Sequence, residues 1–201
     1  MLRSEKGQRN FVNAAARVLK STPNARFVIV GGGRGSYVDS LNAKIRQKFP
    51  MAASPLVVTG YREDISQVMA ALDVVVVPSL YEAQTIVIPQ AFAAGKPVIA
   101  SRVGGIPELV RHEENGLLVQ PAKDEELAAA MLRLLGEPVL RANLASAGLR
   151  LARCDLSFDK KAELVLKSYR KALEPGVLER RRRLGILHRA SPERLAEAAG
   201  R

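Results

Sequence analysis

The chain has 201 residues, 47% of them hydrophobic, and a formal net charge of +11. This length suits a single domain, and the hydrophobic content excludes a disordered chain. One cysteine, Cys154, excludes a disulfide framework, and two histidines exclude a histidine-rich metal site. No apolar run approaches the length of a membrane helix, and residues 1–10 are polar and charged. We therefore expect a cytoplasmic protein without a secretory signal.

Positive charge is concentrated at the start of the chain. Residues 1–60 contain ten Lys or Arg and only two Asp or Glu. Such an excess favours a phosphate-bearing ligand, an anionic membrane surface or nucleic acid. Aromatic residues make up only 4% of the chain, and neither a basic recognition helix nor zinc-finger spacing is present. We therefore expect no nucleic-acid partner.

Short apolar runs alternate with helical patterns along the chain. The predicted strands cover residues 26–31, 55–60, 73–78, 97–101 and 116–119. The predicted helices cover residues 8–20, 37–48, 65–72, 86–94, 107–111, 124–135, 141–153, 158–173 and 191–199. Near-continuous apolar runs are typical of parallel strands that are buried on both faces. The pattern predicts an α/β fold, a doubly wound parallel sheet with C-terminal helices.

The predicted domain has an unusual beginning. Its first helix starts near Gly7, and almost no strand precedes it. We expect a Rossmann-like donor-binding domain over residues 1–174 that lacks most of its first strand. A basic, partly helical tail is expected over residues 175–201.

The most informative stretch covers residues 73–110 (DVVVVPSLYEAQTIVIPQAFAAGKPVIASRVGGIPELV). Its first strand ends at Ser79, on the edge of the sheet where ligands bind in such folds. Glu82 follows in the loop. Gln84 and Thr85 are expected to open a helix, whose free backbone N–H groups would favour an anion such as phosphate. Ser79 itself suits either a turn or a ligand contact.

Two glycine clusters leave alternatives open. Residues 31–33 (GGG) match neither the dinucleotide-binding nor the phosphate-loop spacing, so both a tight turn and a phosphate cradle fit them. Gly104 and Gly105 follow a predicted strand. They suit either a structural turn or a position beside a bound sugar or its acceptor.

Residues 73–110 resemble the family 4 (group 1) glycosyltransferases, in the C-terminal nucleotide-sugar-binding domain of their GT-B fold. The likeness covers roughly residues 2–170. It includes a basic loop at residues 3–7 (RSEKG), a strand and glycine turn at 28–33 (VIVGGG), and a turn and strand at 115–119 (NGLLV).

The resemblance implies a role for individual residues. Glu82 would hold a hydroxyl of the donor sugar, and Lys6 would hold the diphosphate. Arg3 would act with Lys6 on the diphosphate, although it stands only three residues before Lys6, closer than the usual arginine of the family. Gln90 replaces a second Glu that bonds the ribose, and it keeps an acceptor oxygen but no charge. The remaining donor-contacting positions implied are Gly33, Tyr61, Arg62, Ser79, Ala83, Gln84, Thr85 and Ile86.

The implied activity is that of a retaining, metal-independent hexosyl-type glycosyltransferase that uses a nucleotide diphosphate sugar and no cofactor. It would act in cell-envelope, lipopolysaccharide or lipid-linked glycan synthesis, with an N-terminal acceptor-binding domain as its partner. Three alternatives stay open. One is a donor-binding module that is inactive without that domain. A second is another GT-B enzyme, such as a nucleotide-sugar epimerase or a glycogen-synthase-like polymerase. The third is a basic scaffold on an anionic surface, the inner membrane.

Overall fold

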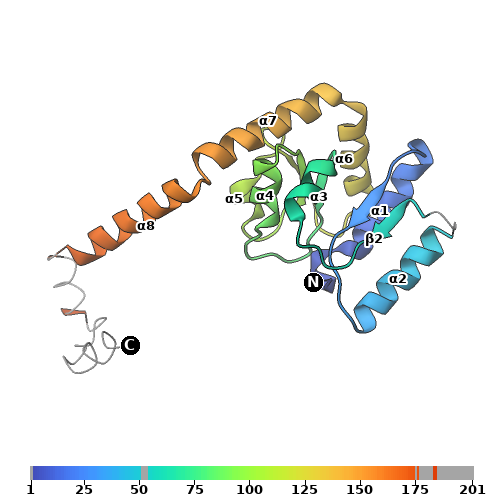
Figure 1. Ribbon diagram of the computed structural model, residues 1–201, viewed down its shortest axis with the longest axis horizontal. Helices are drawn as coiled ribbons and strands as arrows, with labels where there is room; N and C mark the ends of the chain where they lie inside the picture. The colour runs from blue at the N-terminus through green and yellow to red at the C-terminus, as the bar shows by residue number, and fades with distance from the viewer. Residues whose placement is uncertain (1, 51–53, 175, 177–182, 185–201) are drawn as a thin grey trace. The chain divides into compact units, whose positions relative to one another are not determined.

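A computed structural model describes residues 2–50, 54–174, 176, 183 and 184 (Figure 1). The chain divides into two compact units, Met1–Cys154 and Asp155–Arg201. The domain boundary predicted at residue 174 stays a prediction. The helix expected over residues 191–199 lies outside the described residues, as does most of the basic tail.

Each of the five predicted strands is confirmed in a shorter form. They are β1 (Phe27–Ile29), β2 (Leu56–Val58), β3 (Val75–Val77), β4 (Val98–Ser101) and β5 (Leu117–Val119). The first unit also contains the 3-10 helix η1 (Ser4–Lys6) and helices α1 (Gln8–Ser21), α2 (Ser36–Lys48), α3 (Ile65–Ala71), α4 (Val87–Ala93), α5 (Ile106–Leu109), α6 (Asp124–Gly136) and α7 (Pro138–Cys154). The second unit contains α8 (Phe158–Leu173).

Helix α4 begins later than predicted. Gln84 and Thr85 do not open it, because the helix starts at Val87. The Thr85 hydroxyl oxygen accepts a hydrogen bond from the Val87 backbone N–H at 3.2 Å. A local bond of this kind competes with helix geometry, so residues 84–86 form the entry to the helix rather than its first turn.

The strands are all parallel, which confirms the predicted α/β class. They form two hydrogen-bonded groups, β1 with β2 and β3 with β4 and β5. Doubly wound sheets commonly have the strand order 3-2-1-4-5-6. In that order β1 and β2 would be the second and third strands, and β3, β4 and β5 would be the fourth, fifth and sixth. The first strand of the order would then lie between β1 and β3. No strand of the described residues fills that position.

The start of the chain lies at the carboxyl ends of β1 and β3. The Leu2 backbone N–H donates to the Gly32 carbonyl oxygen at 3.1 Å, just after β1. Gly7 approaches Pro78, just after β3, so closely that an added Cβ would lie 1.8 Å from the Pro78 carbonyl oxygen. Residues 2–7 therefore connect the ends of the two strand groups.

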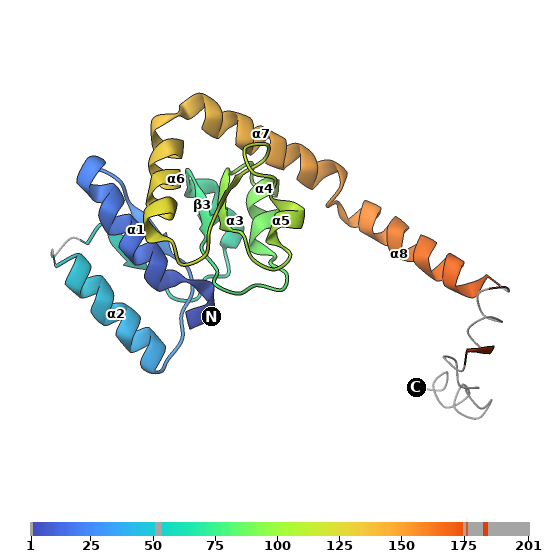
Figure 2. The same ribbon diagram turned by 180° about the vertical axis from the view of Figure 1, so that it is seen from behind.

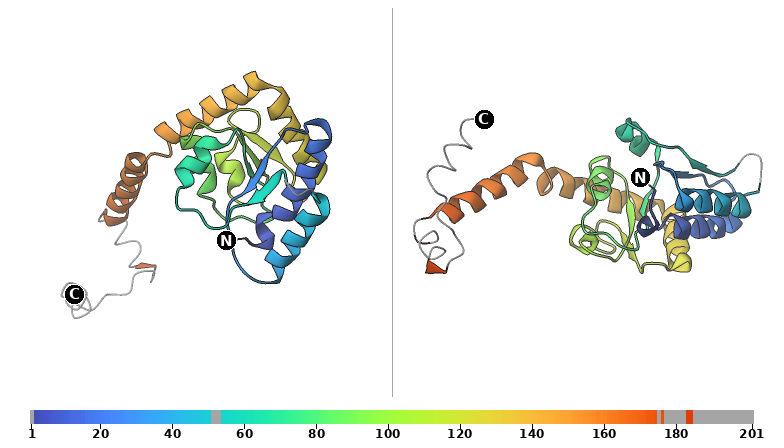
Figure 3. Two further views of the ribbon diagram at one scale, coloured as in Figure 1. Left: turned by 45° about the vertical axis from the view of Figure 1, so that its right-hand side comes forward. Right: turned by 90° about the horizontal axis from the view of Figure 1, so that it is seen from below.

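Helices cover both faces of the strands. One face packs against α1, α2 and α6, through fully or almost fully buried side chains that include Val12, Val18, Leu41, Met131 and Leu134. Helix α1 lies beside α6 (Figure 2) and beside α2 (Figure 3). Successive strand residues point to opposite faces, so Val75 and Val77 face away from this core. On their side, α4 and α5 bury Ile88, Phe92 and Ile106 completely.

A polar contact joins α1 to α6 beside the apolar core. Asn10 Nδ2 donates to Asp124 Oδ1 at 2.7 Å, and Asn13 Nδ2 donates to Asp124 Oδ2 at 2.5 Å. Both bonds are partly buried, and their acceptor is a carboxylate. Hydrogen bonds to charged groups are stronger than neutral ones. Asp124 therefore fixes the position of α1, which directly follows the basic loop.

We expect Asp124→Ala to lower the free energy of unfolding by about 2 kcal/mol, because two side-chain amides lose a charged acceptor. This corresponds to a fall of about 6 °C in the thermal midpoint. The neighbouring Glu125 supplies a control, because its ion pair with Arg17 is exposed. Glu125→Ala should change the midpoint little. A fall of equal size in the two variants would contradict the role assigned to Asp124.

Helix α8 carries both apolar and basic side chains. Val165, Leu166 and Tyr169 are each more than half exposed. Ser157 is the N-cap of the helix, and its hydroxyl oxygen accepts a hydrogen bond from the Lys160 backbone N–H. Of the helices in the described part of the chain, none is long and apolar enough to span a bilayer.

Candidate functional site

Glu82 and Lys6 meet although 76 residues separate them in the chain. Lys6 Nζ lies 2.6 Å from Glu82 Oε2. The Glu82 side chain is 8% exposed and that of Lys6 is 41% exposed, so a nearly buried carboxylate is paired with an accessible ammonium. Ser79 Oγ also donates to Glu82 Oε2, at 3.4 Å. Within the described residues both bonds end on Oε2, which leaves Oε1 to accept a bond from a ligand hydroxyl.

The backbone holds the basic loop against the loop that carries Glu82. The Glu5 carbonyl oxygen accepts hydrogen bonds from the N–H groups of Leu80 at 2.7 Å and Tyr81 at 3.3 Å. Because Glu5 belongs to η1 and precedes Lys6, these bonds place the ammonium over the carboxylate. Ser79 is 1% exposed and begins the same loop. The site is therefore assembled at the carboxyl end of β3.

Gly104 and Gly105 support the opposite side of this loop. An added Cβ on Gly104 would lie 1.5 Å from the Glu82 carbonyl oxygen, and one on Gly105 would lie 2.8 Å from the Ala83 carbonyl oxygen. The Gly105 N–H also donates to the Ala83 carbonyl oxygen at 3.2 Å. The sequence left two interpretations of Gly104 and Gly105 open, a structural turn or a position beside a bound sugar. The described contacts are those of a turn packed against the loop of Glu82.

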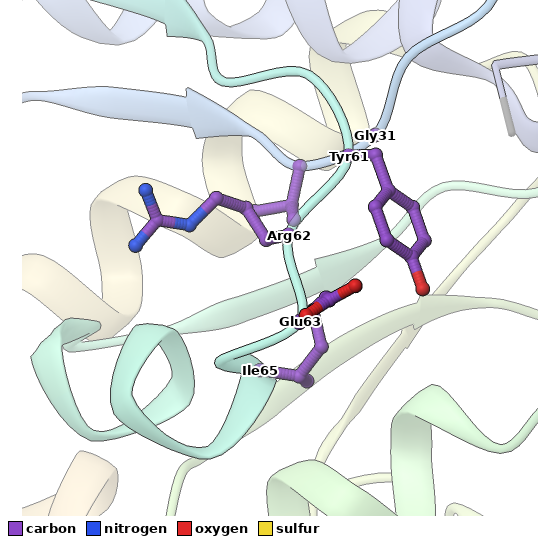
Figure 4. A pocket seen from close by; sticks show the side chains of 6 residues that line it. Gly31, Tyr61, Arg62, Glu63 and Ile65 are labelled. Carbon is purple, nitrogen blue, oxygen red and sulfur yellow. The ribbon is translucent and has the colours of Figure 1, made fainter.

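A pocket of about 390 Å³ lies at the carboxyl ends of β1 and β2 (Figure 4). Its lining consists of Val30, Gly31, Tyr61, Arg62, Glu63 and Ile65. Gly31 and Gly60 are paired across the two strand ends, which brings the glycine turn next to the loop of Tyr61. Tyr61 is 81% exposed, so one face of its ring is available to a planar ligand.

Arg62 is oriented by Asp64. Its Nε donates to Asp64 Oδ1 at 2.7 Å, and its Nη2 donates to Oδ2. In Figure 4 the Arg62 side chain extends to the other side of the loop from the Tyr61 ring. The hydrogen bonds from Arg62 lower the pKa of the Asp64 carboxyl and raise the pKa of the guanidinium, so the pair stays charged near neutral pH.

The structure thus brings together most, but not all, of the predicted site residues. Arg3 lies 3.8 Å from Glu5, and its side chain is 59% exposed. Its role at the diphosphate stays a prediction. Gly33 is exposed and is not among the residues that line the Tyr61 pocket. Gln90 is exposed on α4, and its backbone N–H donates to the Ile86 carbonyl oxygen.

The residues after Glu82 differ in their exposure to solvent. Ala83 and Gln84 are exposed, Ile86 is 73% exposed, and Thr85 is 7% exposed. Thr85 therefore acts in the structure through its bond to Val87 rather than as a surface group. In residues 2–50 and 54–174, no group of three or more His, Cys, Asp or Glu is placed to hold a metal ion. Metal independence stays a prediction.

Sequence reasoning missed two contributions to the site. Glu5 acts through its backbone carbonyl, which no side-chain pattern reveals. The packing of Gly104 was offered only as one of two possibilities, although a glycine pair directly after a strand is a signal for close backbone approach.

Comparisons with known proteins agree with this architecture. Residues 1–137 match the family described as "Glycosyl transferases group 1". The chain is 36% identical over 166 residues to the D-inositol 3-phosphate glycosyltransferase of Rhodococcus erythropolis, covering 80% of this chain and 37% of that protein. The chain therefore spans less than half the length of this curated relative.

This chain is also similar to solved structures. HepE of Anabaena in complex with UDP superposes with a TM-score of 0.76 at 30% identity, over 85% of this chain and 46% of that one. The C-terminal domain of a group 1 glycosyltransferase, LpcC from Francisella tularensis, superposes with a TM-score of 0.71 at 28% identity. That match covers 78% of this chain and 83% of the solved domain.

Proposed function

The chain belongs to the group 1 glycosyltransferases, and we propose that it is the donor-binding part of a retaining hexosyltransferase that uses a nucleotide diphosphate sugar. The pairing of nearly buried Glu82 with Lys6 carries this proposal. The pair lies at the carboxyl end of β3, and the Tyr61 pocket lies at the carboxyl ends of β1 and β2. Residues 2–7, which include Lys6, connect the ends of the two strand groups. A base pocket, a cation and a buried carboxylate in this order fit the base, diphosphate and sugar of such a donor.

Each group has a chemical task in this arrangement. The base lies against Tyr61 in the 390 Å³ pocket. Lys6 neutralises the negative charge that grows on the diphosphate as the glycosidic bond to it breaks. The Oε1 atom of Glu82 accepts a hydrogen bond from a sugar hydroxyl and so orients the ring. Solved relatives of HepE type are described in complex with UDP and with UDP-glucose, which supports a uridine donor.

The neighbouring residues complete the donor site in this proposal. The exposed residues Ala83 and Gln84 give backbone N–H groups to the phosphate, and Gln90 accepts one hydrogen bond from the ribose through its amide oxygen. No cofactor or metal takes part. Because Gln90 carries no charge, its contribution to nucleotide affinity is smaller than that of a carboxylate.

Transfer itself requires more than this chain in our proposal. An N-terminal acceptor-binding domain supplies the other wall of the cleft, in agreement with the partial coverage of the relatives. The isolated chain then binds the donor without transferring its sugar. A cytoplasmic place of action, envelope or lipid-linked glycans as products, and contact of the basic surface with the inner membrane complete the proposal.

Glu82→Gln separates sugar contact from nucleotide contact. Calorimetry would use whichever of UDP-glucose, GDP-mannose and ADP-glucose binds the wild-type chain most tightly, together with the matching nucleoside diphosphate. We expect the affinity for the nucleotide sugar to fall about tenfold, because the sugar hydroxyl loses a charged acceptor. The affinity for the nucleoside diphosphate should not fall, since Lys6 is no longer engaged by a carboxylate.

A matched control removes one negative charge elsewhere. Glu108 is exposed on α5, and Glu108→Gln should leave both affinities unchanged. If Glu82→Gln weakened the nucleoside diphosphate and the nucleotide sugar by the same factor, Glu82 would have no contact with the sugar.

A further inference from the structure

The pocket beside the Tyr61 ring has an unpaired carboxylate in its wall. Glu63 lines this pocket, and among the described residues its side chain has no hydrogen-bond or ion-pair partner. In Figure 4 its carboxylate extends toward the side of the loop on which the Tyr61 ring lies. A carboxylate carries only acceptor atoms. A ligand that covers Glu63 must therefore replace the surrounding water with a hydrogen-bond donor of its own.

The cation that stands next to Glu63 in the chain is committed to another partner. Arg62 donates from Nε to Asp64 Oδ1 at 2.7 Å and from Nη2 to Asp64 Oδ2. Its side chain extends to the other side of the loop from the Tyr61 ring (Figure 4). The guanidinium thus forms its ion pair with Asp64 and none with Glu63. The negative charge of Glu63 remains available to a ligand.

The loop that carries Glu63 is held against the glycine turn after β1. The Gly31 N–H donates to the Gly60 carbonyl oxygen at 2.9 Å. An added Cβ on Gly32 would lie 3.3 Å from the Tyr61 backbone nitrogen, so the two backbones are in direct contact. These contacts define where the loop begins. A carboxylate on a fixed loop can distinguish between ligands, because the site does not rearrange to suit each of them.

The rest of the pocket lining suits a planar base without selecting one. Val30 and Ile65 are partly buried and supply apolar surface, and the Tyr61 ring is largely exposed. Aromatic stacking tolerates any base, because every base has a π-face. Bases are told apart by the hydrogen bonds on their Watson–Crick edges. Of the groups that line this pocket, the Glu63 carboxylate is the charged one that can read such an edge while Arg62 is bound to Asp64.

We propose that Glu63 selects the base of the donor, and that it selects a base with a ring N–H on its Watson–Crick edge. The proposal deepens the donor-binding function above and rests on it. Uracil and guanine carry such an N–H, which donates to a carboxylate oxygen of Glu63. Cytosine and adenine have an unprotonated nitrogen at the same place, and its lone pair is repelled by the carboxylate. A site built around a hydrogen bond strongly rejects an analogue that cannot form it.

The test is calorimetry on the full chain with UDP, CDP, GDP and ADP. UDP and CDP differ only on the Watson–Crick edge of the base, so the ratio of their affinities isolates the contact with that edge. We expect UDP to bind at least about tenfold more tightly than CDP, and GDP at least about tenfold more tightly than ADP. The reason is that a hydrogen bond to a charged acceptor is replaced by a repulsion. The tighter of UDP and GDP identifies which of the two bases the donor carries.

Three variants assign the selectivity to Glu63. Glu63→Gln should lower both ratios about tenfold, because the amide of Gln can accept a bond from uracil or donate one to cytosine. Glu108→Gln removes the same charge from an exposed position on α5 and should leave both ratios unchanged. Tyr61→Ala should weaken the four nucleotides by similar factors and so also preserve the ratios, since stacking does not depend on the base.

Two results would overturn the role of Glu63 and leave the donor proposal intact. The first is equal affinity of the wild-type chain for UDP and CDP together with equal affinity for GDP and ADP. The second is selectivity that persists undiminished in Glu63→Gln, because another group would then read the base. Failure of the donor proposal has a different signature, since none of the four nucleotides would bind, and the role of Glu63 would fall with it.

Discussion

Gly104→Ala should lower the affinity for the nucleotide sugar about a hundredfold. The new Cβ would lie 1.5 Å from the Glu82 carbonyl oxygen, whereas real Cβ contacts stay above 3.0 Å. Gly104 also has a φ of +51°, a left-handed conformation that alanine adopts only with strain. The loop must therefore move by about 1.5 Å and carry the Glu82 carboxylate away from its place. In catalysis, a misplacement of about 1 Å costs about a hundredfold in rate, and we expect a loss of the same order in the affinity for the positioned sugar.

Alanine variants of two further glycines serve as comparisons for the loss of nucleotide-sugar affinity. Gly105→Ala meets the Ala83 carbonyl oxygen at 2.8 Å from an ordinary φ, so its loss of affinity should be smaller. Gly95→Ala has a similar left-handed φ of +66°, and its nearest neighbour, Leu149, is 3.8 Å away. It should not affect affinity. Calorimetry at a temperature where all variants remain folded makes the comparison. Wild-type affinity in Gly104→Ala would show that the loop does not position Glu82.

Gly7→Ala should have a large effect on stability, a loss of about 3 kcal/mol from the first unit. Gly7 has a φ of +67°, and its Cβ would lie 1.8 Å from the Pro78 carbonyl oxygen. One part of the loss is backbone strain, and the larger part is displacement of the chain start from the end of β3. The thermal midpoint should fall by roughly 10 °C.

Gly95→Ala isolates the backbone strain, because its φ of +66° is almost the same and no close contact accompanies it. It should cost only about 1 kcal/mol. Thermal unfolding followed by circular dichroism measures both variants. If the two midpoints fell equally, the approach of Gly7 to Pro78 would contribute nothing.

Much of the fold was predictable because its signals are local. Each strand is a short apolar run rich in β-branched residues, and such runs in parallel sheets differ clearly from amphipathic helices. Glu82 and Lys6 were predicted as site residues because each stands in a sequence block that resembles the family. Their direct pairing at 2.6 Å was not predicted, since it depends on the packing of η1 against the loop after β3.

The remaining features depend on tertiary contacts. The support of Glu82 by Gly104 joins segments from two strands, and the sequence alone cannot distinguish it from an exposed turn. The late start of α4 follows from one hydroxyl, Thr85, that competes with the backbone of the helix.

In the described residues β1 and β3 belong to separate hydrogen-bonded groups, and each has a backbone edge that faces away from its own partner strand. In β1, the Phe27 N–H bonds to β2 at the Pro55 carbonyl oxygen, so Val28 directs its own N–H and C=O to the opposite side. In β3, the Val75 N–H bonds to the Pro97 carbonyl oxygen of the neighbouring chain segment, so Val76 is directed away from β4.

These two edges form a seam that a single extended segment could close, with hydrogen bonds on both sides at once. Strand edges of this kind act as templates for pairing with another chain. Residues 2–7 form the closed end of the seam, and Lys6 is one of them. A change in the spacing of β1 and β3 therefore also moves the segment that carries the cation of the donor site.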